Sequence, residues 1–270
     1  MNNKLFFLLF NLLLLVNVSS AQVKSFYYQD KNLPCLDKKF TIAVHFVKDS
    51  TGDTFVSEDS LLAYIGVVNK LFKPICASFE LCSIDTLSYY EYDFISDEKE
   101  NSKMQKIFNK KFRINLYVVN HVKKSLPEFC GLATFKGITH MFDGDIIAEK
   151  KCTNGLFMCH IFGHYFGLQH TSFNTNTELV NGSNCTTAGD KICDTPADPY
   201  DPYEPVLENL PFINVKTCTF ISKKKDANGE YYRPDVGNIM SLYKECFCGF
   251  SSGQYRLMAE NYLNAPIKMW

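Results

Sequence analysis

The fold of this chain is decided by residues 160–170, which read His-Ile-Phe-Gly-His-Tyr-Phe-Gly-Leu-Gln-His. A helix places residues four apart on one face, so His160 and His164 can reach one metal ion together. Gly167 falls where such a helix has to end, and a glycine there can take the left-handed conformation that turns the chain. The turn brings His170 round as a third nitrogen ligand. Three imidazoles leave one tetrahedral position open, which is typical of a catalytic zinc site rather than a structural one.

One residue of this stretch departs from the usual zinc motif. The pattern H-E-x-x-H-x-x-G-x-x-H carries a glutamate that acts as proton acceptor, and this chain has Ile161 in its place. An isoleucine can neither accept a proton nor orient a water molecule. Cys159 precedes His160, but one helical step of about 100° points it away from the ligand face, which favours a packed thiol. The sequence therefore predicts a complete metal site without its base.

The first 21 residues have the features of a secretory signal peptide. Lys4 provides a positive charge, Leu5–Val16 form an apolar run, and Ser19–Ala21 offer small residues for cleavage before Gln22. No later segment approaches about 20 consecutive apolar residues, so we expect no membrane span. The sequence predicts a mature domain of residues 22–270 that is secreted to an extracellular or periplasmic space.

Charge and cysteine content narrow the class of protein further. A formal net charge of −1 and a pI of about 6.6 give no indication of a nucleic-acid partner. All 11 cysteines follow the predicted cleavage site, and export makes disulfides their default state. The odd number leaves at least one thiol unpaired within a monomer.

The pattern of apolar residues predicts an α/β (α+β) fold. Strand patterns occupy residues 40–47, 79–84, 113–119, 131–135 and 145–148, and the third is nearly continuous in apolar character and therefore central. Ser57 can cap one helix, and a last helix starts near Ser251 or Ser252. Residues 171–238 show little periodicity. We expect a twisted sheet with helices in an upper subdomain, about 22–170, above an irregular, disulfide-linked lower subdomain, about 171–270, with the histidines between them.

Four ordered stretches resemble the metzincin metallopeptidases, and within them the pappalysin family. They are residues 160–171; Asn184-Cys185 with Gly189–Asp198; Asn238-Ile239-Met240-Ser241, which is similar to the methionine turn of that family; and Cys246 with residues 250–258. The upstream half matches only in its general pattern. The resemblance implies a two-subdomain zinc peptidase fold, with zinc held by His160, His164 and His170, Gly167 turning the chain, and Met240 supporting the site from below.

The resemblance also implies how the lower subdomain is held together. It implies two disulfides, Cys185 with Cys218 and Cys193 with Cys246. For Asp190, Asp194 and Asp198 it favours a structural role in their loop, and calcium binding by these carboxylates stays open as an alternative.

The family reaction is peptide-bond hydrolysis, and two features of this chain bear on it. Loss of a positioned acid/base group costs about 10²–10⁴-fold in rate. In similar proteins, a tyrosine two residues past the methionine lies near the oxyanion. This chain has Leu242 at that position and Tyr243 one residue later, so only a shifted backbone would bring the tyrosine hydroxyl to the same place.

Two functions stay open. One is a secreted zinc peptidase that is slow or uses a substitute carboxylate; the other, which Ile161 favours, is a pseudopeptidase that binds an extracellular peptide or protein without cutting it.

Overall fold

The computed structural model describes residues 32–49, 51, 56–96, 98–122, 130–133, 145–174, 177–201 and 212–265. The signal peptide predicted over residues 1–21 lies outside these ranges. Within them, no helix is long and apolar enough to cross a membrane.

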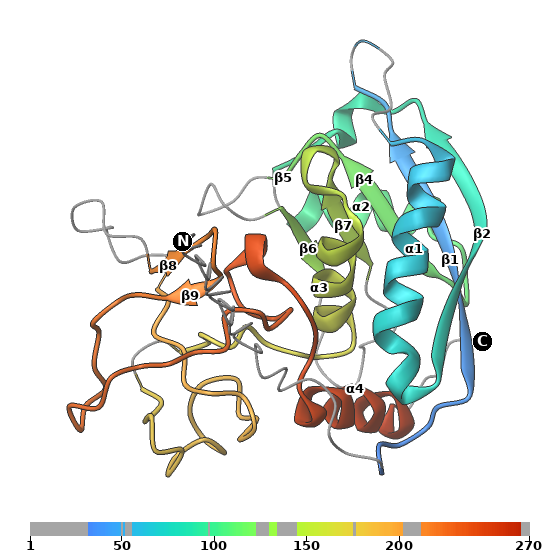
Figure 1. Cartoon of the computed structure of the whole chain (residues 1–270). Helices are drawn as coiled ribbons and strands as arrows, with labels where there is room; N and C mark the ends of the chain where they lie inside the picture. The colour runs from blue at the N-terminus through green and yellow to red at the C-terminus, as the bar shows by residue number, and fades with distance from the viewer. Residues whose placement is uncertain are drawn as a thin grey trace, which may run out of the picture.

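A five-stranded sheet forms the framework of the molecule (Figure 1). Its order is β2-β1-β4-β7-β6, and the strands are β1 (Lys38–Val47), β2 (Ala77–Leu87), β4 (Ile114–Val119), β6 (Gly131–Ala133) and β7 (Ile146–Glu149). Strands β2, β1, β4 and β7 run parallel, and β6 pairs with β7 in the antiparallel direction. All six residues of β4 are buried, which confirms its predicted central place. Two short pairs join β3 (Phe94–Ile95) to β5 (His121–Val122) and β8 (Ile213–Asn214) to β9 (Thr219–Phe220).

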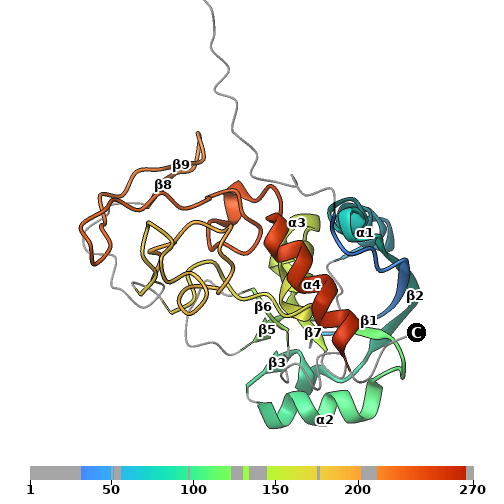
Figure 2. The same ribbon diagram turned by 90° about the horizontal axis from the view of Figure 1, so that it is seen from below.

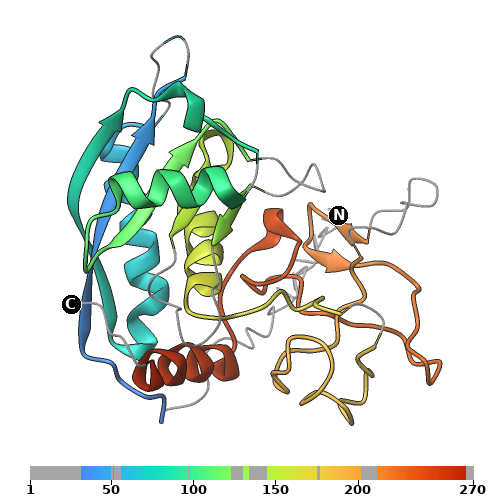
Figure 3. The same ribbon diagram turned by 180° about the vertical axis from the view of Figure 1, so that it is seen from behind.

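Helices cover both faces of this sheet. α1 (Glu58–Phe72) and α3 (Gly155–Tyr165) lie side by side on one face, and α2 (Glu98–Phe108) lies across the other (Figures 1 and 3). Ser57 caps α1, as predicted. The sequence pattern did not predict α2, because its stretch is rich in charged residues. The described residues also form the single-turn helices η1 (Lys73–Ile75), η2 (Tyr90–Tyr92), η4 (Lys150–Cys152) and η6 (Lys244–Cys246).

The last helix, α4 (Ser252–Asn264), returns beneath α1 and α3 (Figure 2). Ser251 caps it through a reciprocal pair of bonds with Gln254. The Tyr255 hydroxyl donates to the carbonyl oxygen of Leu71 at 2.6 Å, and the Tyr262 ring meets Phe40 edge-on. The end of the chain is therefore anchored to the first helix and the first strand.

Most of residues 171–250 form irregular loops beside the sheet (Figure 1). A small apolar cluster gathers there around Ile213, Tyr243 and Cys246. The prediction of a mixed α/β fold with a disulfide-linked, irregular lower subdomain is confirmed.

The disulfide pairing that the resemblance implied is wrong. Cys185 bonds to Cys193, and Cys218 bonds to Cys246. The loop that begins at Asn184 turns back on itself, because Thr187 and Ala188 both donate to the carbonyl oxygen of Asn184, and the Cα atoms of Cys185 and Cys193 lie 5.0 Å apart. This separation is within disulfide range, so the nearest cysteine takes the bond.

Two further disulfides join Cys35 to Cys76 and Cys130 to Cys152, and Cys82, Cys159 and Cys248 are free.

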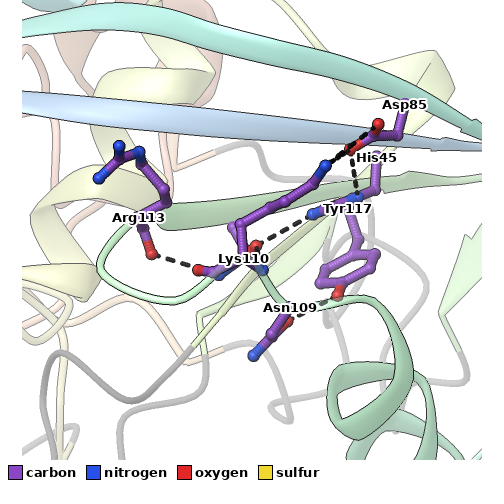
Figure 4. A network of polar contacts seen from close by, with 7 residues as sticks. His45, Asp85, Asn109, Lys110, Arg113 and Tyr117 are labelled. Carbon is purple, nitrogen blue, oxygen red and sulfur yellow. Dashed lines mark hydrogen bonds and ion pairs between the residues drawn. The ribbon is translucent and has the colours of Figure 1, made fainter.

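A polar network joins β1, β2 and β4 on the face that α2 covers (Figure 4). Burial lowers the pKa of His45, so its ring is neutral, and Nε2 donates to Asn115 Oδ1 at 3.0 Å. The ring also stacks on Tyr117, and its Nδ1 lies 3.5 Å from Asp85, which pairs with Lys110 at 3.1 Å. These contacts tie three neighbouring strands together, which is a structural role.

The sheet edge at β6 gives a test of the packing between α3 and the sheet. A Cβ atom at Gly131 would lie 2.5 Å from the carbonyl oxygen of Ile147 and 2.6 Å from Cδ1 of Ile161. A backbone oxygen cannot move aside, so we expect Gly131→Ala to lower the free energy of unfolding by about 1–3 kcal/mol. Chemical denaturation measures this change.

Gly66, on the exposed face of α1, provides the matched control. Nothing lies within 4 Å of a Cβ atom there, so Gly66→Ala should raise the free energy of unfolding by about 0.5–1 kcal/mol. An unchanged stability in Gly131→Ala would contradict the close packing of α3 on β6.

Candidate metal centre

The end of α3 turns the chain as the glycine predicts. The amide of Leu168 donates to the carbonyl oxygen of Gly163, and the amide of Gly167 to that of His164, both at 2.9 Å. This double closure is the Schellman motif, and it requires a left-handed residue just past the helix. Gly167 takes that place with φ +94°. The turn brings His170 back towards the helix.

The three histidine side chains converge. The Nε2 atoms lie 3.1 Å apart for His160 and His164, 3.0 Å for His164 and His170, and 3.3 Å for His160 and His170. Nitrogen ligands of a tetrahedral zinc are about 3.3–3.4 Å apart, given zinc–nitrogen bonds of about 2.0–2.1 Å. In the described ranges these three residues form the only group of three or more potential metal ligands. The donor set fits a zinc ion.

Two backbone carbonyl groups set which nitrogens face the centre. Nδ1 of His160 lies 2.6 Å from the carbonyl oxygen of Ile239, and Nδ1 of His164 lies 2.8 Å from that of Leu168. A carbonyl oxygen only accepts, so each Nδ1 carries the hydrogen and the Nε2 of a neutral ring holds a lone pair. Two lone pairs about 3 Å apart repel unless a cation lies between them. The arrangement is therefore that of ligands oriented for a metal.

The rings are also held in the neutral form that binds metals. Burial, together with the neighbouring His164, lowers the pKa of His160 to about 3. Burial likewise lowers the pKa of His164, and burial together with the other two histidines holds the pKa of His170 well below its usual range. At neutral pH no proton competes for the three Nε2 lone pairs.

The turn at residues 238–241 supports the centre from below. Met240 is fully buried, and its sulfur lies 2.5 Å from where a Cβ atom of Gly163 would be, so only glycine lets α3 approach it so closely. The carbonyl oxygen of Ile239 holds His160, and that of Met240 accepts the amide of Thr171 at 3.0 Å. Asn238 and Gln254 exchange amide hydrogen bonds and so fix the turn on α4. These contacts hold the turn that carries Met240 against α3; the supporting role of Met240 that the resemblance implied stays a prediction.

Apolar side chains form one flank of the site. Ile161 is 2% exposed and fills the space between α3 and Gly131 of β6. The Phe247 ring stacks on His160, with 5.5 Å between the ring centres and an angle of 9°. Cys159 is buried and its thiol donates to the carbonyl oxygen of Gly155, as expected for a packed thiol. Among the described residues, the histidine group contains no carboxylate.

Tyr243 does not present a free hydroxyl. Its ring is buried in the cluster with Ile213 and Cys246, and its hydroxyl donates to Asp198 Oδ1 at 2.9 Å. Leu242, which is half-buried, keeps the place two residues past Met240. The shifted backbone that would return a tyrosine to that place is absent from the described turn.

The acidic loop makes structural contacts. Asp190 accepts from the Ile192 amide and the Thr195 hydroxyl, both of its own loop. Asp194 accepts from Ser251 Oγ at 2.7 Å and from the Gly253 amide at 2.6 Å, which stabilises the positive end of α4. The described ranges contain no second group of three potential metal ligands, so calcium at this loop stays a sequence prediction.

Sequence reasoning missed the groups that orient the ligands. The carbonyl groups of Ile239 and Leu168 belong to the backbone, and no side-chain pattern indicates them. Phe247 gave no signal either, because only the fold brings it against His160.

Comparison with known proteins leaves the function to the geometry. No protein-family model and no curated protein matches this chain. The crystal structure of metalloproteinase-II from Bacteroides fragilis aligns with 53% of this chain and 46% of that chain, at 12% identity and a TM-score of 0.34. A structure of a chaperone–substrate complex aligns with 80% of this chain and 35% of that chain, at 13% identity and a TM-score of 0.34. The chain spans less than half the length of both, and likenesses this distant carry no argument about family or activity.

Two buried carboxyl groups of the lower subdomain predict how stability varies with pH. Burial, together with Asp190 and Asp198, raises the pKa of Glu178 to about 8, and burial raises the pKa of Asp190 to about 7. Their pKa values in the unfolded chain are about 4, so folding takes up protons between about pH 4 and pH 8. The free energy of unfolding should therefore fall as the pH rises through this window, as thermal melts at pH 6 and pH 9 would measure.

Glu178→Gln removes the group with the widest window and should flatten the profile. A profile equally steep in the variant would contradict this assignment. The same melts test the calcium alternative, because a calcium ion held by ionised carboxylates would stabilise the protein most at high pH.

Proposed function

We propose that this chain is a secreted zinc-binding protein of the pappalysin-like metallopeptidase type in which peptide hydrolysis is slow or lost. His160, His164 and His170 hold the zinc ion. The observation that carries the proposal is the convergence of three Nε2 atoms within 3.3 Å of one another, with two Nδ1 atoms fixed on backbone carbonyls. Four disulfides among the described residues support export to an oxidising compartment.

The chain's own residues explain the weak catalysis. A bound zinc ion supplies Lewis acidity, which polarises a carbonyl group and acidifies water. Peptide hydrolysis also needs a group that accepts the water's proton and returns it to the leaving amine. Ile161 cannot do so, and Tyr243 gives its hydroxyl to Asp198. The missing base alone costs about 10²–10⁴-fold, or about 3–5 kcal/mol of activation barrier.

The second candidate is a binding module that keeps the fold and the zinc but cuts nothing. The half-buried ring of Phe247 favours it, because this ring stacks on His160 and offers an apolar group that can contact a peptide side chain. The ligand in either case is an extracellular peptide or protein. The two candidates differ only in whether activity remains.

Zinc binding is the first test of the proposal. The purified mature protein should contain one zinc ion per chain by elemental analysis, and His164→Ala should lose it, because two imidazoles hold zinc far less tightly than three. Gln169→Ala changes the same turn without removing a ligand and should keep the metal. A wild-type protein that takes up no zinc after dialysis against the metal would contradict the proposal.

Replacement of Ile161 tests the cause of low activity. Ile161→Glu should raise the rate of chelator-sensitive peptide cleavage by about 10²-fold or more, because it supplies the missing base. In Ile161→Gln, the glutamine is polar and has the shape of glutamate but is not a base, so the cleavage rate should stay at the wild-type level. Leu242→Tyr in the Ile161→Glu background should increase the rate further.

Each outcome separates the two candidate functions. Chelator-sensitive cleavage by the wild type at the rate of Ile161→Glu would refute the inactive module. An inactive wild type beside an active Ile161→Glu protein would show that the base alone was lost. Equal rates for the Glu and Gln variants would refute the role assigned to position 161.

A further inference from the structure

Asp198 joins three separate segments of the chain. Its side chain is buried, with 4% exposed. Oδ2 accepts the hydroxyl hydrogen of Thr171 at 2.7 Å, and Oδ1 accepts from the Tyr243 hydroxyl at 2.9 Å and from the Tyr200 amide at 3.1 Å. One carboxylate thus connects the turn after α3, its own loop and the segment that follows Met240.

Thr171 is the residue directly after His170, and it is held twice. Its amide donates to the carbonyl oxygen of Met240 at 3.0 Å, and its hydroxyl donates to Asp198. His160 and His164 lie on α3, where the helix fixes their backbone. His170 lies past the helix end. The two hydrogen bonds of Thr171 therefore fix the backbone next to His170, as helical hydrogen bonds fix the backbone at His160 and His164.

The contacts of Asp198 are those of a residue that fixes the positions of other groups, rather than those of a residue that fills space. Among the described residues, its hydrogen-bond donors are hydroxyl and amide groups rather than basic side chains. A carboxylate buried among neutral donors is costly, and a well-packed apolar side chain would stabilise a loop at less cost. What the carboxylate adds is a pair of acceptors at fixed positions, because its two oxygens hold Thr171 and Tyr243 at a constant separation.

We infer that Asp198 is a positioning residue of the metal site: through Thr171 it fixes the turn that carries His170. This inference rests on the proposed function, because it assumes that the three histidines bind zinc. Groups that orient metal ligands typically change metal affinity about 10–100-fold when they are removed.

Substitutions at Thr171 test the link with little change in volume. Thr171→Val removes the hydroxyl that Asp198 accepts, and Thr171→Ser keeps it. Thr195→Val is the matched control, because Thr195 is also buried and donates to an aspartate of the same loop, Asp190, at 2.8 Å, without a bond to the histidine turn. Asp198→Ala is a second variant of the link, since alanine has no acceptor for the Thr171 hydrogen.

Three measurements on the full mature chain separate positioning from stability. They are the dissociation constant for zinc, by competition with a chromophoric chelator; the visible absorption of the cobalt-substituted protein; and the melting temperature of the metal-free protein. Thr171→Val and Asp198→Ala should weaken zinc binding about 10–100-fold and change the cobalt spectrum, whereas Thr171→Ser should stay within about twofold of the wild type. Thr195→Val should lower the melting temperature and leave zinc affinity within about twofold.

Failure of this inference and failure of the proposed function give different results. If the wild type binds no zinc, both are overturned. If the wild type binds one zinc ion that His164→Ala loses, yet Thr171→Val binds it equally tightly, only the role of Asp198 is overturned. A loss of affinity in Thr195→Val as large as that in Thr171→Val would also overturn it, because loop stability would then explain both.

Discussion

The site depends on the fixed orientation of two imidazole rings. The carbonyl groups of Ile239 and Leu168 each accept a hydrogen bond from an Nδ1 atom, so the lone pairs of two Nε2 atoms point at one another and at a third histidine. In a protein without a metal this arrangement would be repulsive. A cation at the centre would remove this repulsion. The surrounding structure holds the arrangement in place, because the turn at 238–241 lies on α4 and α4 lies beneath α1.

The site keeps its ligand geometry without its acid/base group. Ile161 occupies the space between α3 and the sheet edge as a core residue, so this position offers no acid/base group. The carboxylates nearby in sequence are used elsewhere: Asp194 stabilises the start of α4, and Asp198 joins three loops. Metal binding and acid/base catalysis therefore depend on different residues, so one can be lost while the other remains.

The sequence predicted the elements whose signals are local. The helix cap at Ser57, the central strand at residues 114–119 and the glycine turn at Gly167 each follow from the residues of one short segment. It did not predict α2, because the helix is rich in charged residues and its apolar stripe is narrow. The disulfides implied by the resemblance were wrong. Pairing depends on how the loop that begins at Asn184 folds, and bonds from Thr187 and Ala188 to one carbonyl oxygen turn it back on itself.

In the candidate site, too, local sequence signals predict some features and only the fold determines the others. Spacing alone predicts that His160, His164 and His170 can meet, but the groups that orient them are backbone carbonyls and a distant aspartate, which only the fold brings close. The central claim is that these three Nε2 atoms bind one zinc ion. Anomalous diffraction at the zinc edge, from crystals of the mature protein, tests it most directly. The account predicts one peak about 2.0–2.1 Å from all three Nε2 atoms; a zinc ion bound elsewhere, or three histidines that point apart around an empty centre in zinc-saturated crystals, would contradict it.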